Sequence, residues 1–433
     1  MRMNENIQET ETSIPKPDLD SKINKSERKK SPWRQVLQAP VIIAALGYFV
    51  DIYDLLLFSI VRIPSLKALG LSGDQLLKEG IFLINVQMAG LFVGGILWGV
   101  LGDKKGRLSV LFGSILLYSL ANIANGFVTS VPQYAVLRFI AGVGLAGELG
   151  AGITLVAEIL PKHIRGYGTT LVAAVGLFGA VLAYFVAEYT NWMVAYWIGG
   201  GMGLSLLLLR YTVAESGMFD QIKHTKVDRG NFFLLFSKMH LFLNYLRCIF
   251  IGLPIWFVIG ILITFSPEFA TSLNMTDPVD AGKAVMFCYI GLSLGDLSSG
   301  TISQFLKSRR KVVLIFILIT AIAVALYLTI SKLSVPVFYG TCFLLGFSIG
   351  YWALFVTIAA EQFGTNIRAT VATTVPNFVR GTVLPLTFVF EILRVNLDMV
   401  KSAWIVGLIS ITIALLALWK MKETFGKDLD FTD

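Results

Sequence analysis

Twelve apolar stretches, each long enough to cross a lipid bilayer, follow one another along this chain. A membrane-spanning helix needs about 20 consecutive apolar residues, and none of these stretches alternates in the way that barrel strands do. The stretches lie at residues 40–62, 81–101, 108–128, 132–157, 167–187, 191–209, 248–266, 283–305, 312–331, 335–359, 371–392 and 402–419. The sequence therefore predicts an all-α membrane protein with twelve transmembrane helices.

The charged residues are few, and their distribution predicts the orientation. They make up 15% of the chain, against about 25% in soluble domains, which argues against a soluble enzyme or a nucleic-acid-binding domain. If both termini are cytoplasmic, the inner segments hold 27 Lys and Arg and the outer loops hold 7. This asymmetry predicts cytoplasmic termini in the plasma membrane, the inner membrane of a bacterium, with the lipid bilayer and no nucleic acid as a partner.

The longest polar stretch inside the chain divides it into two sets of six spans. The first residues are polar and mixed in charge, which is typical of a disordered tail. The expected units are a cytoplasmic tail (1–38), a first six-helix half (39–210), a central cytoplasmic loop (211–245), a second six-helix half (246–420) and a second cytoplasmic tail (421–433).

A short fragment recurs in both halves. Glu158 and Arg165 in the first half correspond to Glu361 and Arg368 in the second half, at an offset of 203 residues. Two six-helix repeats of like orientation place a binding site between them, near the bilayer midplane, which opens alternately to each side. The sequence therefore predicts alternating access rather than a fixed channel.

Three motifs in the first half resemble those of one family. The residues from Gly99 to Arg107 are similar to a G-x-L-x-D-x-x-G-R signature, those from Arg138 to Gly144 to R-x-x-x-G-x-G, and those from Glu158 to Gly166 to E-x-x-P-x-x-x-R-G. Together they resemble the major facilitator superfamily, in its sugar-porter-like and metabolite–proton symporter branches. The resemblance implies the major facilitator fold of two six-helix pseudo-repeats.

The resemblance also implies a set of gating residues. These lie in the quoted motifs, in their counterparts in the second half, and in degraded family motifs after spans six and twelve. The implied gating residues are Gly99, Asp103, Gly106, Arg107, Arg138, Glu158, Arg165, Glu215, Glu361, Arg368 and Glu423.

Five ionisable residues fall near the middle of predicted spans, and such residues are functional candidates because burying charge in a bilayer is costly. A buried carboxylate can load and release a proton, so the candidate proton-coupling residues are Asp51, Asp54, Glu148 and Asp296. The pattern D-x-Y-D at positions 51–54 also resembles proton-coupled family members. Arg380 is the candidate to hold a carboxylate or phosphate of a substrate; the alternative is that it only neutralises Asp296 or Glu391. Aromatic candidates for the substrate site are Trp256, Tyr53 and Tyr289.

Three functions remain open at this stage. The first is proton-coupled symport of a small, anionic organic metabolite; the second is proton antiport that exports drugs or a siderophore; the third is a membrane sensor that does not transport. The seventh span lacks the glutamine-rich stretch of hexose porters, which argues against a sugar. No P-loop, nucleophile elbow or metal constellation is visible in the sequence, so we expect a protein that is not an enzyme and needs no cofactor or metal. We also expect the protein to be a monomer.

Overall fold

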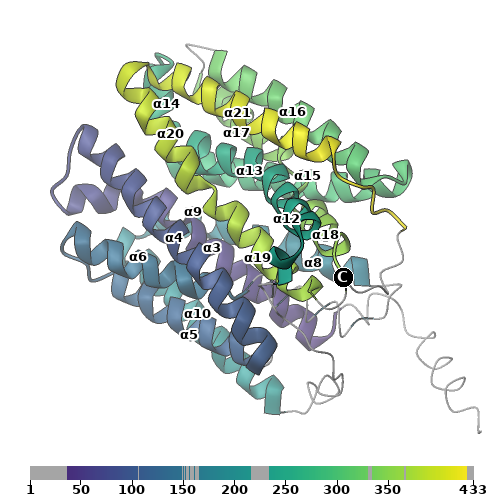
Figure 1. Ribbon diagram of the computed structural model, residues 1–433. Helices are drawn as coiled ribbons and strands as arrows, with labels where there is room; N and C mark the ends of the chain where they lie inside the picture. The colour runs from purple at the N-terminus through teal and green to yellow at the C-terminus, as the bar shows by residue number, and fades with distance from the viewer. Residues whose placement is uncertain are drawn as a thin grey trace, which may run out of the picture.

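The computed structural model describes the membrane-embedded part of the chain with a few gaps. The described residues are 37–105, 107–148, 150, 152, 156, 160, 165–215, 234–329, 334–364 and 367–426. Every regular element within these ranges is a helix. Figure 1 shows the helices of the first half, in purple and blue, on one side and those of the second half, in green and yellow, on the other.

The first half contains long helices, two of which share a single span. Helices α8 and α9 follow each other with a break at Phe178 and together cross the membrane once. The helices are α3 (Ala39–Ala68), α4 (Asp74–Lys105), α5 (Arg107–Asn125), α6 (Val131–Leu145), α8 (Arg165–Leu177), α9 (Gly179–Tyr189) and α10 (Trp192–Glu215).

The second half contains more interruptions. Its helices are α11 (Leu234–Ser237), α12 (Met239–Ile251), α13 (Leu253–Phe257), the π-helix η2 (Val258–Ile263), α14 (Ser266–Ser272), α15 (Ala281–Leu306), α16 (Arg309–Thr329), α17 (Val335–Ser348), α18 (Trp352–Glu361), α19 (Arg368–Gly381), α20 (Val383–Asn396) and α21 (Met399–Trp419). Three spans are composite: α12 to α14, α17 with α18, and α19 with α20. Broken helices of this kind line the binding sites of many transporters, because the freed backbone groups can contact a ligand.

The described helices account for the twelve predicted spans. Nine helical segments within the described ranges are long and apolar enough to cross a membrane, and Val110–Asn125 and Val131–Leu145 are shorter apolar helices. Helices α19 and α20 supply the remaining span. The predicted twelve-helix architecture is therefore confirmed.

The helices around the central loop are longer than the sequence indicated. Helix α10 continues to Glu215 and α12 begins at Met239, whereas the loop was expected at 211–245. Charged residues such as Arg210 lowered the local apolarity, although they lie on a continuing helix. The expected loop boundaries therefore fall inside helices.

The two halves meet along two pairs of helices. Helix α4 packs against α19, and α9 packs against α15. Between α4 and α19 the rings of Phe92 and Phe378 stack with their centroids 4.3 Å apart. This interface brings the middle of α3 close to α15, α18 and α19, where the buried charges lie.

Candidate functional site

A buried ion pair joins the two halves at mid-membrane depth. The Nη2 atom of Arg380 on α19 lies 3.2 Å from Oδ2 of Asp51 on α3, and the two side chains are 1% and 0% exposed. Within the described residues, Nε and Nη1 of Arg380 and Oδ1 of Asp51 have no hydrogen-bond partner. A buried charge pair is costly unless its remaining polar atoms are satisfied. This pair therefore has free donors and a free acceptor to offer to a ligand or to water.

Aromatic side chains surround this ion pair. The guanidinium carbon of Arg380 lies 5.9 Å from the centre of the Trp352 ring, within the range of a cation–π contact. Tyr48 and Tyr289 are buried and close enough to Arg380 and Asp51 to interact with their charges. The site therefore combines a cation with flat apolar walls, a combination that suits a small organic anion with a ring.

Trp256, a predicted substrate residue, lies on α13 close to this region. Gly252, directly before α13, packs against Val379, the neighbour of Arg380 in sequence. Trp256 is 3% exposed, and its indole Nε1 has no hydrogen-bond partner among the described residues. Tyr53 lies elsewhere, since its buried hydroxyl donates a hydrogen bond of 2.9 Å to the carbonyl of Ala195 on α10.

Asp296 lies at the break between α17 and α18. Its Oδ1 atom accepts a hydrogen bond of 3.0 Å from the backbone N–H of Ala353, in the first turn of α18. A carboxylate in this place caps the helix in the way an N-cap residue does. Because Trp352 begins α18, this contact also helps to hold the Trp352 ring near Arg380.

Glu148 forms a second buried ion pair, within the first half. Its Oε2 atom accepts a hydrogen bond of 3.1 Å from Nη1 of Arg210 on α10, and its Oε1 atom accepts a shorter one from Nη2. Both side chains are buried. Gly47 on α3 lies directly against the pair, and a Cβ there would overlap both Glu148 and Arg210.

Asp54 and Arg138 lie deeper in the first half. Asp54 is 0% exposed, and neither carboxylate oxygen has a hydrogen-bond partner within the described ranges. Arg138 donates a short hydrogen bond to Gln87, and its guanidinium lies 5.0 Å from the Phe58 ring centre. The structure thus places Arg138 inside the first half and near Asp54.

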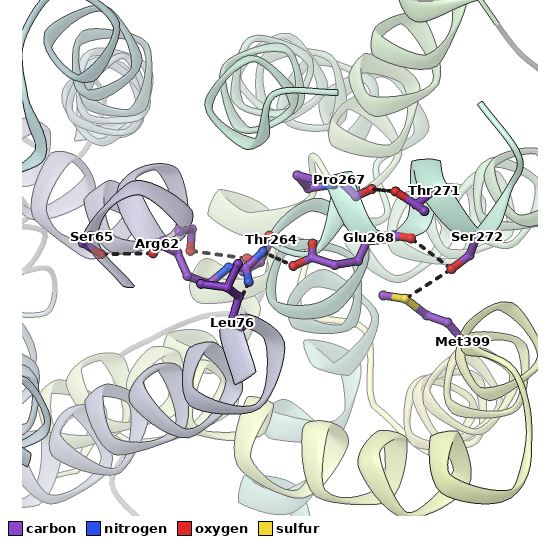
Figure 2. A network of polar contacts seen from close by, with 10 residues as sticks. Arg62, Ser65, Leu76, Thr264, Pro267, Glu268, Thr271, Ser272 and Met399 are labelled. Atoms are coloured by element: carbon purple, nitrogen blue, oxygen red, sulfur yellow. Dashed lines mark hydrogen bonds and ion pairs between the residues drawn. The ribbon is translucent and has the colours of Figure 1, made fainter. Parts of the chain in front are cut away.

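A third ion pair connects the halves near the C-terminal end of α3. The Nη2 atom of Arg62 on α3 lies 2.6 Å from Oε1 of Glu268 on α14 (Figure 2). Arg62 also donates to the carbonyls of Leu76 and Thr264. At the same end, Arg394 lies 3.1 Å from Asp74 and thereby joins α20 to α4.

The predicted gating residues are only partly described. Two of them, Gly106 and Glu158, lie outside the described residues. For five others the structure describes the backbone but not the side chain: Asp103, Arg107, Arg165, Glu215 and Arg368. Gly99 faces α19, where a Cβ would meet Thr374 at an ordinary distance of 3.5 Å. Glu361 forms an ion pair with Arg309, at 2.8 Å, within the second half.

Glu423 caps the N-terminus of α16, although the two lie far apart in the sequence. Its carboxylate accepts a hydrogen bond from Ser308 and others from the backbone N–H groups of Arg309 and Arg310, at 3.0 and 3.3 Å, at the start of α16. Partial burial raises the pKa of Glu423, but these bonds and the N–H groups of Phe425 and Thr424 outweigh it, so that the pKa lies below its usual value. Glu423 therefore fastens the C-terminal segment to α16.

Depth along the helices indicated the burial of the five ionisable residues near mid-span, but not that of Arg62 and Arg210, nor which residues pair. The structure brings Asp51 and Arg380 together, and it joins Glu148 to Arg210. Arg62 and Arg210 stand at the ends of predicted spans and are not among the predicted site residues, yet both are buried ion-pair partners. Their positions at the very ends of apolar runs were the one available signal. Within the described ranges, no group of three His, Cys, Asp or Glu residues could hold a metal ion.

A helical membrane protein with charges buried between two six-helix halves has the architecture of a membrane transporter. Residues 44–382 match the Major Facilitator Superfamily, and the chain belongs to this family. The matched family and its relatives are transporters rather than enzymes.

Curated relatives and solved structures agree with this assignment. The chain is 27% identical to the "Probable 4-methylmuconolactone transporter" of Cupriavidus pinatubonensis, over 75% of this chain and 76% of the relative. It is 24% identical to the niacin transporter NiaP of Acinetobacter baylyi, over 76% of this chain and 80% of the relative. The structure of the proton:xylose symporter XylE is similar in fold, with a TM-score of 0.68, 18% identity, and coverage of 92% of this chain and 98% of that chain.

Proposed function

We propose that this protein imports a small organic carboxylate together with a proton, across the inner membrane of a bacterium, with both termini in the cytoplasm. The observation that carries the proposal is the buried pair of Asp51 and Arg380 between the halves, with two guanidinium nitrogens that have no hydrogen-bond partner among the described residues and lie beside aromatic rings. Relatives are named for niacin, benzoate and 4-hydroxybenzoate. These compounds share a carboxylate on a flat ring, which matches a cation flanked by aromatic walls.

The ion pair offers a direct coupling mechanism. While Asp51 is ionised, it neutralises Arg380 and competes with any anion for the guanidinium. When Asp51 takes up a proton, Arg380 loses its counter-charge, and a substrate carboxylate can replace it in a forked contact. Proton and anion therefore favour each other's binding, and this reciprocal coupling favours their transport together.

Rocking of the two halves would then carry both ligands across. Because α3 and α19 belong to different halves, the bond between Asp51 and Arg380 reports on their relative position. One proton moving with one monovalent anion transfers no net charge. A site formed within one chain needs no second copy, so we propose a monomer as the transport unit.

Transport by purified protein in liposomes tests the proposal. Labelled nicotinate, benzoate and 4-hydroxybenzoate are offered from an acidic outside medium, after a thermal-shift screen against organic acids, amino acids, sugars and siderophores. We expect accumulation that depends on the gradient and is lost in Asp51→Asn, while exchange of substrate against substrate continues because Arg380 stays free. The surface variant Asp398→Asn is the matched control.

Other outcomes would replace the proposal. Uptake that ignores the proton gradient would remove proton coupling. Export in response to the same gradient would indicate an antiporter, and saturable binding without exchange would indicate a sensor.

A further inference from the structure

The inward face of α5 carries a row of buried polar side chains. Tyr118, Ser119, Asn122 and Asn125 are all 0% exposed. Within the described part of the chain, the Tyr118 and Ser119 hydroxyls and the nitrogen and oxygen of both asparagine amides have no hydrogen-bond partner. At about 100° per residue, these four positions occupy one side of the helix. The row runs from the middle of α5 to its last residue.

The row faces a carboxylate and a stretch of glycines. Asn122 lies close to Asp54 on α3, although no atom of Asp54 has a partner with good hydrogen-bond geometry among the described residues. On α10, a Cβ at Gly199 would overlap Oδ1 of Asp54, and a Cβ at Gly203 would overlap the Ser119 hydroxyl. The glycines therefore let α10 approach closely, so that Asp54 and the Ser119 hydroxyl lie where larger side chains on α10 would stand.

Buried polar atoms in such numbers need a partner. Buried side-chain donors and acceptors are bonded in the large majority of cases, to protein or to ordered water. A buried water requires two to four polar neighbours and an environment that is not purely apolar. The α5 row, Asp54 and the free Nε and Nη1 of Arg138 supply such neighbours.

We propose that a file of water molecules lies among these polar groups of α3, α5 and α10 and conducts protons from the end of α5 at Asn125 to Asp54. A hydronium ion in the file gives its proton to the Asp54 carboxylate and becomes water. The charged and titratable groups that act on Asp54 or border it are Asp51, Tyr53, Tyr118, Arg138 and Tyr196.

This route lies inside the first half and is separate from the site between the halves. The inference rests on the proposed proton coupling, because a proton held by Asp54 lies one helical turn from Asp51 on α3. Protons would then reach the coupling residues even when a substrate fills the space between the halves.

Accessibility of single thiols to silver ions tests the water file without any substrate. Cys248, Cys288 and Cys342 are replaced by Ser, and Asn122→Cys or Asn125→Cys is added. Silver ions enter from outside, and the remaining thiols are counted with a maleimide after solubilisation. The control is Ala121→Cys, because Ala121 is equally buried on the adjoining side of α5. We expect thiols at 122 and 125 to react at least about tenfold faster than at 121; equal rates would overturn the water file.

A second variant tests whether Asp54 uses the file. We expect Asn122→Leu to lower proton-driven uptake in liposomes about tenfold while substrate exchange continues, and Asn122→Ser to preserve uptake because its hydroxyl supplies a polar group in place of the amide. Unchanged uptake in Asn122→Leu would overturn proton delivery along this route. Failure of the unmodified protein to respond to a proton gradient would refute the proposed function, while the silver reaction would still decide whether the file exists.

Discussion

Arg62 and Glu268 form an ion pair that ties the two halves together at one face of the membrane. Their Nη2 and Oε1 atoms are 2.6 Å apart, and Arg62 is completely buried while the Glu268 side chain is 21% exposed. The Arg62 guanidinium also lies 4.9 Å from the centre of the Phe265 ring. Opening at this face requires these contacts to break, so their free energy contributes to the balance between access states.

We expect Glu268→Gln to favour opening at this face. Loss of the charge weakens the contact with Arg62, and a change of about 1.4 kcal/mol shifts the ratio of states about tenfold. Spin labels on Phe127→Cys and Val395→Cys, both exposed and on different halves, would report a larger population of long distances. The exposed pair of Asp398 and Lys401 lies within one half, so Asp398→Asn should leave the distances unchanged. Identical distributions in both variants would contradict a role for Arg62 and Glu268.

Asp296 offers a test that separates a helix cap from a proton carrier. The Asp296→Asn side chain can still accept the hydrogen bond from the Ala353 N–H, whereas Asp296→Ala cannot. As a cap, Asp296→Ala should lower the free energy of unfolding by about 1 kcal/mol, and Asp296→Asn should keep both stability and transport. Thermal unfolding and liposome uptake measure the two effects. Loss of proton-driven uptake in Asp296→Asn, without loss of stability, would instead support proton coupling by Asp296.

Gly47 leaves the space in which Glu148 and Arg210 pair. A Cβ in Gly47→Ala would overlap both side chains, and breaking a buried pair costs about 3–5 kcal/mol. We expect lower thermal stability and loss of transport. Gly201 on α10 has no neighbour within 4 Å for a Cβ, so Gly201→Ala should be neutral or slightly stabilising. Equal behaviour of the two alanine variants would show that the Glu148–Arg210 pair tolerates displacement.

Glu423 predicts a dependence of stability on pH at the C-terminal segment. Because the pKa of Glu423 is lowered in the folded protein, its contribution is full above the pKa of the unfolded chain and is lost as the pH falls through the folded value. We expect Glu423→Gln to reduce the free energy of unfolding by about 1 kcal/mol at neutral pH. Melting curves of both proteins should converge in acid. A difference that persists at low pH would exclude ionisation of Glu423 as its source.

The twelve spans were predictable because each one leaves an apolar run of recognisable length, even where α19 and α20 are broken by a bend. The depth of Asp51 and Arg380 followed from counting residues along their spans. Counting gives the height of a residue in the bilayer but not the direction in which its side chain points. For that reason the sequence indicated several buried charges at one level, and left open which of them pair.

Other parts of the site left only a weak signal in the sequence. Arg62 and Arg210 stand at the ends of apolar runs, where an arginine normally reaches the lipid headgroups, so their burial depends on neighbouring helices. The polar row of Asn122 and Asn125 consists of uncharged residues, which are common in membrane helices. Their importance became visible only from the structure, because both amides are buried and have no hydrogen-bond partner within the described ranges.

The π-helix η2 determines where Glu268 points. A π-turn contains one residue more than an α-turn, and the hydrogen bond from the Thr264 N–H to the carbonyl of Ile259 spans five residues in this way. Rewinding η2 as an α-helix would turn all following residues by about 100° around the axis, carrying Glu268 away from Arg62. The π-turn in the seventh span therefore sets the direction in which Glu268 points around the helix axis, and the ion pair that joins the halves at this face depends on that turn.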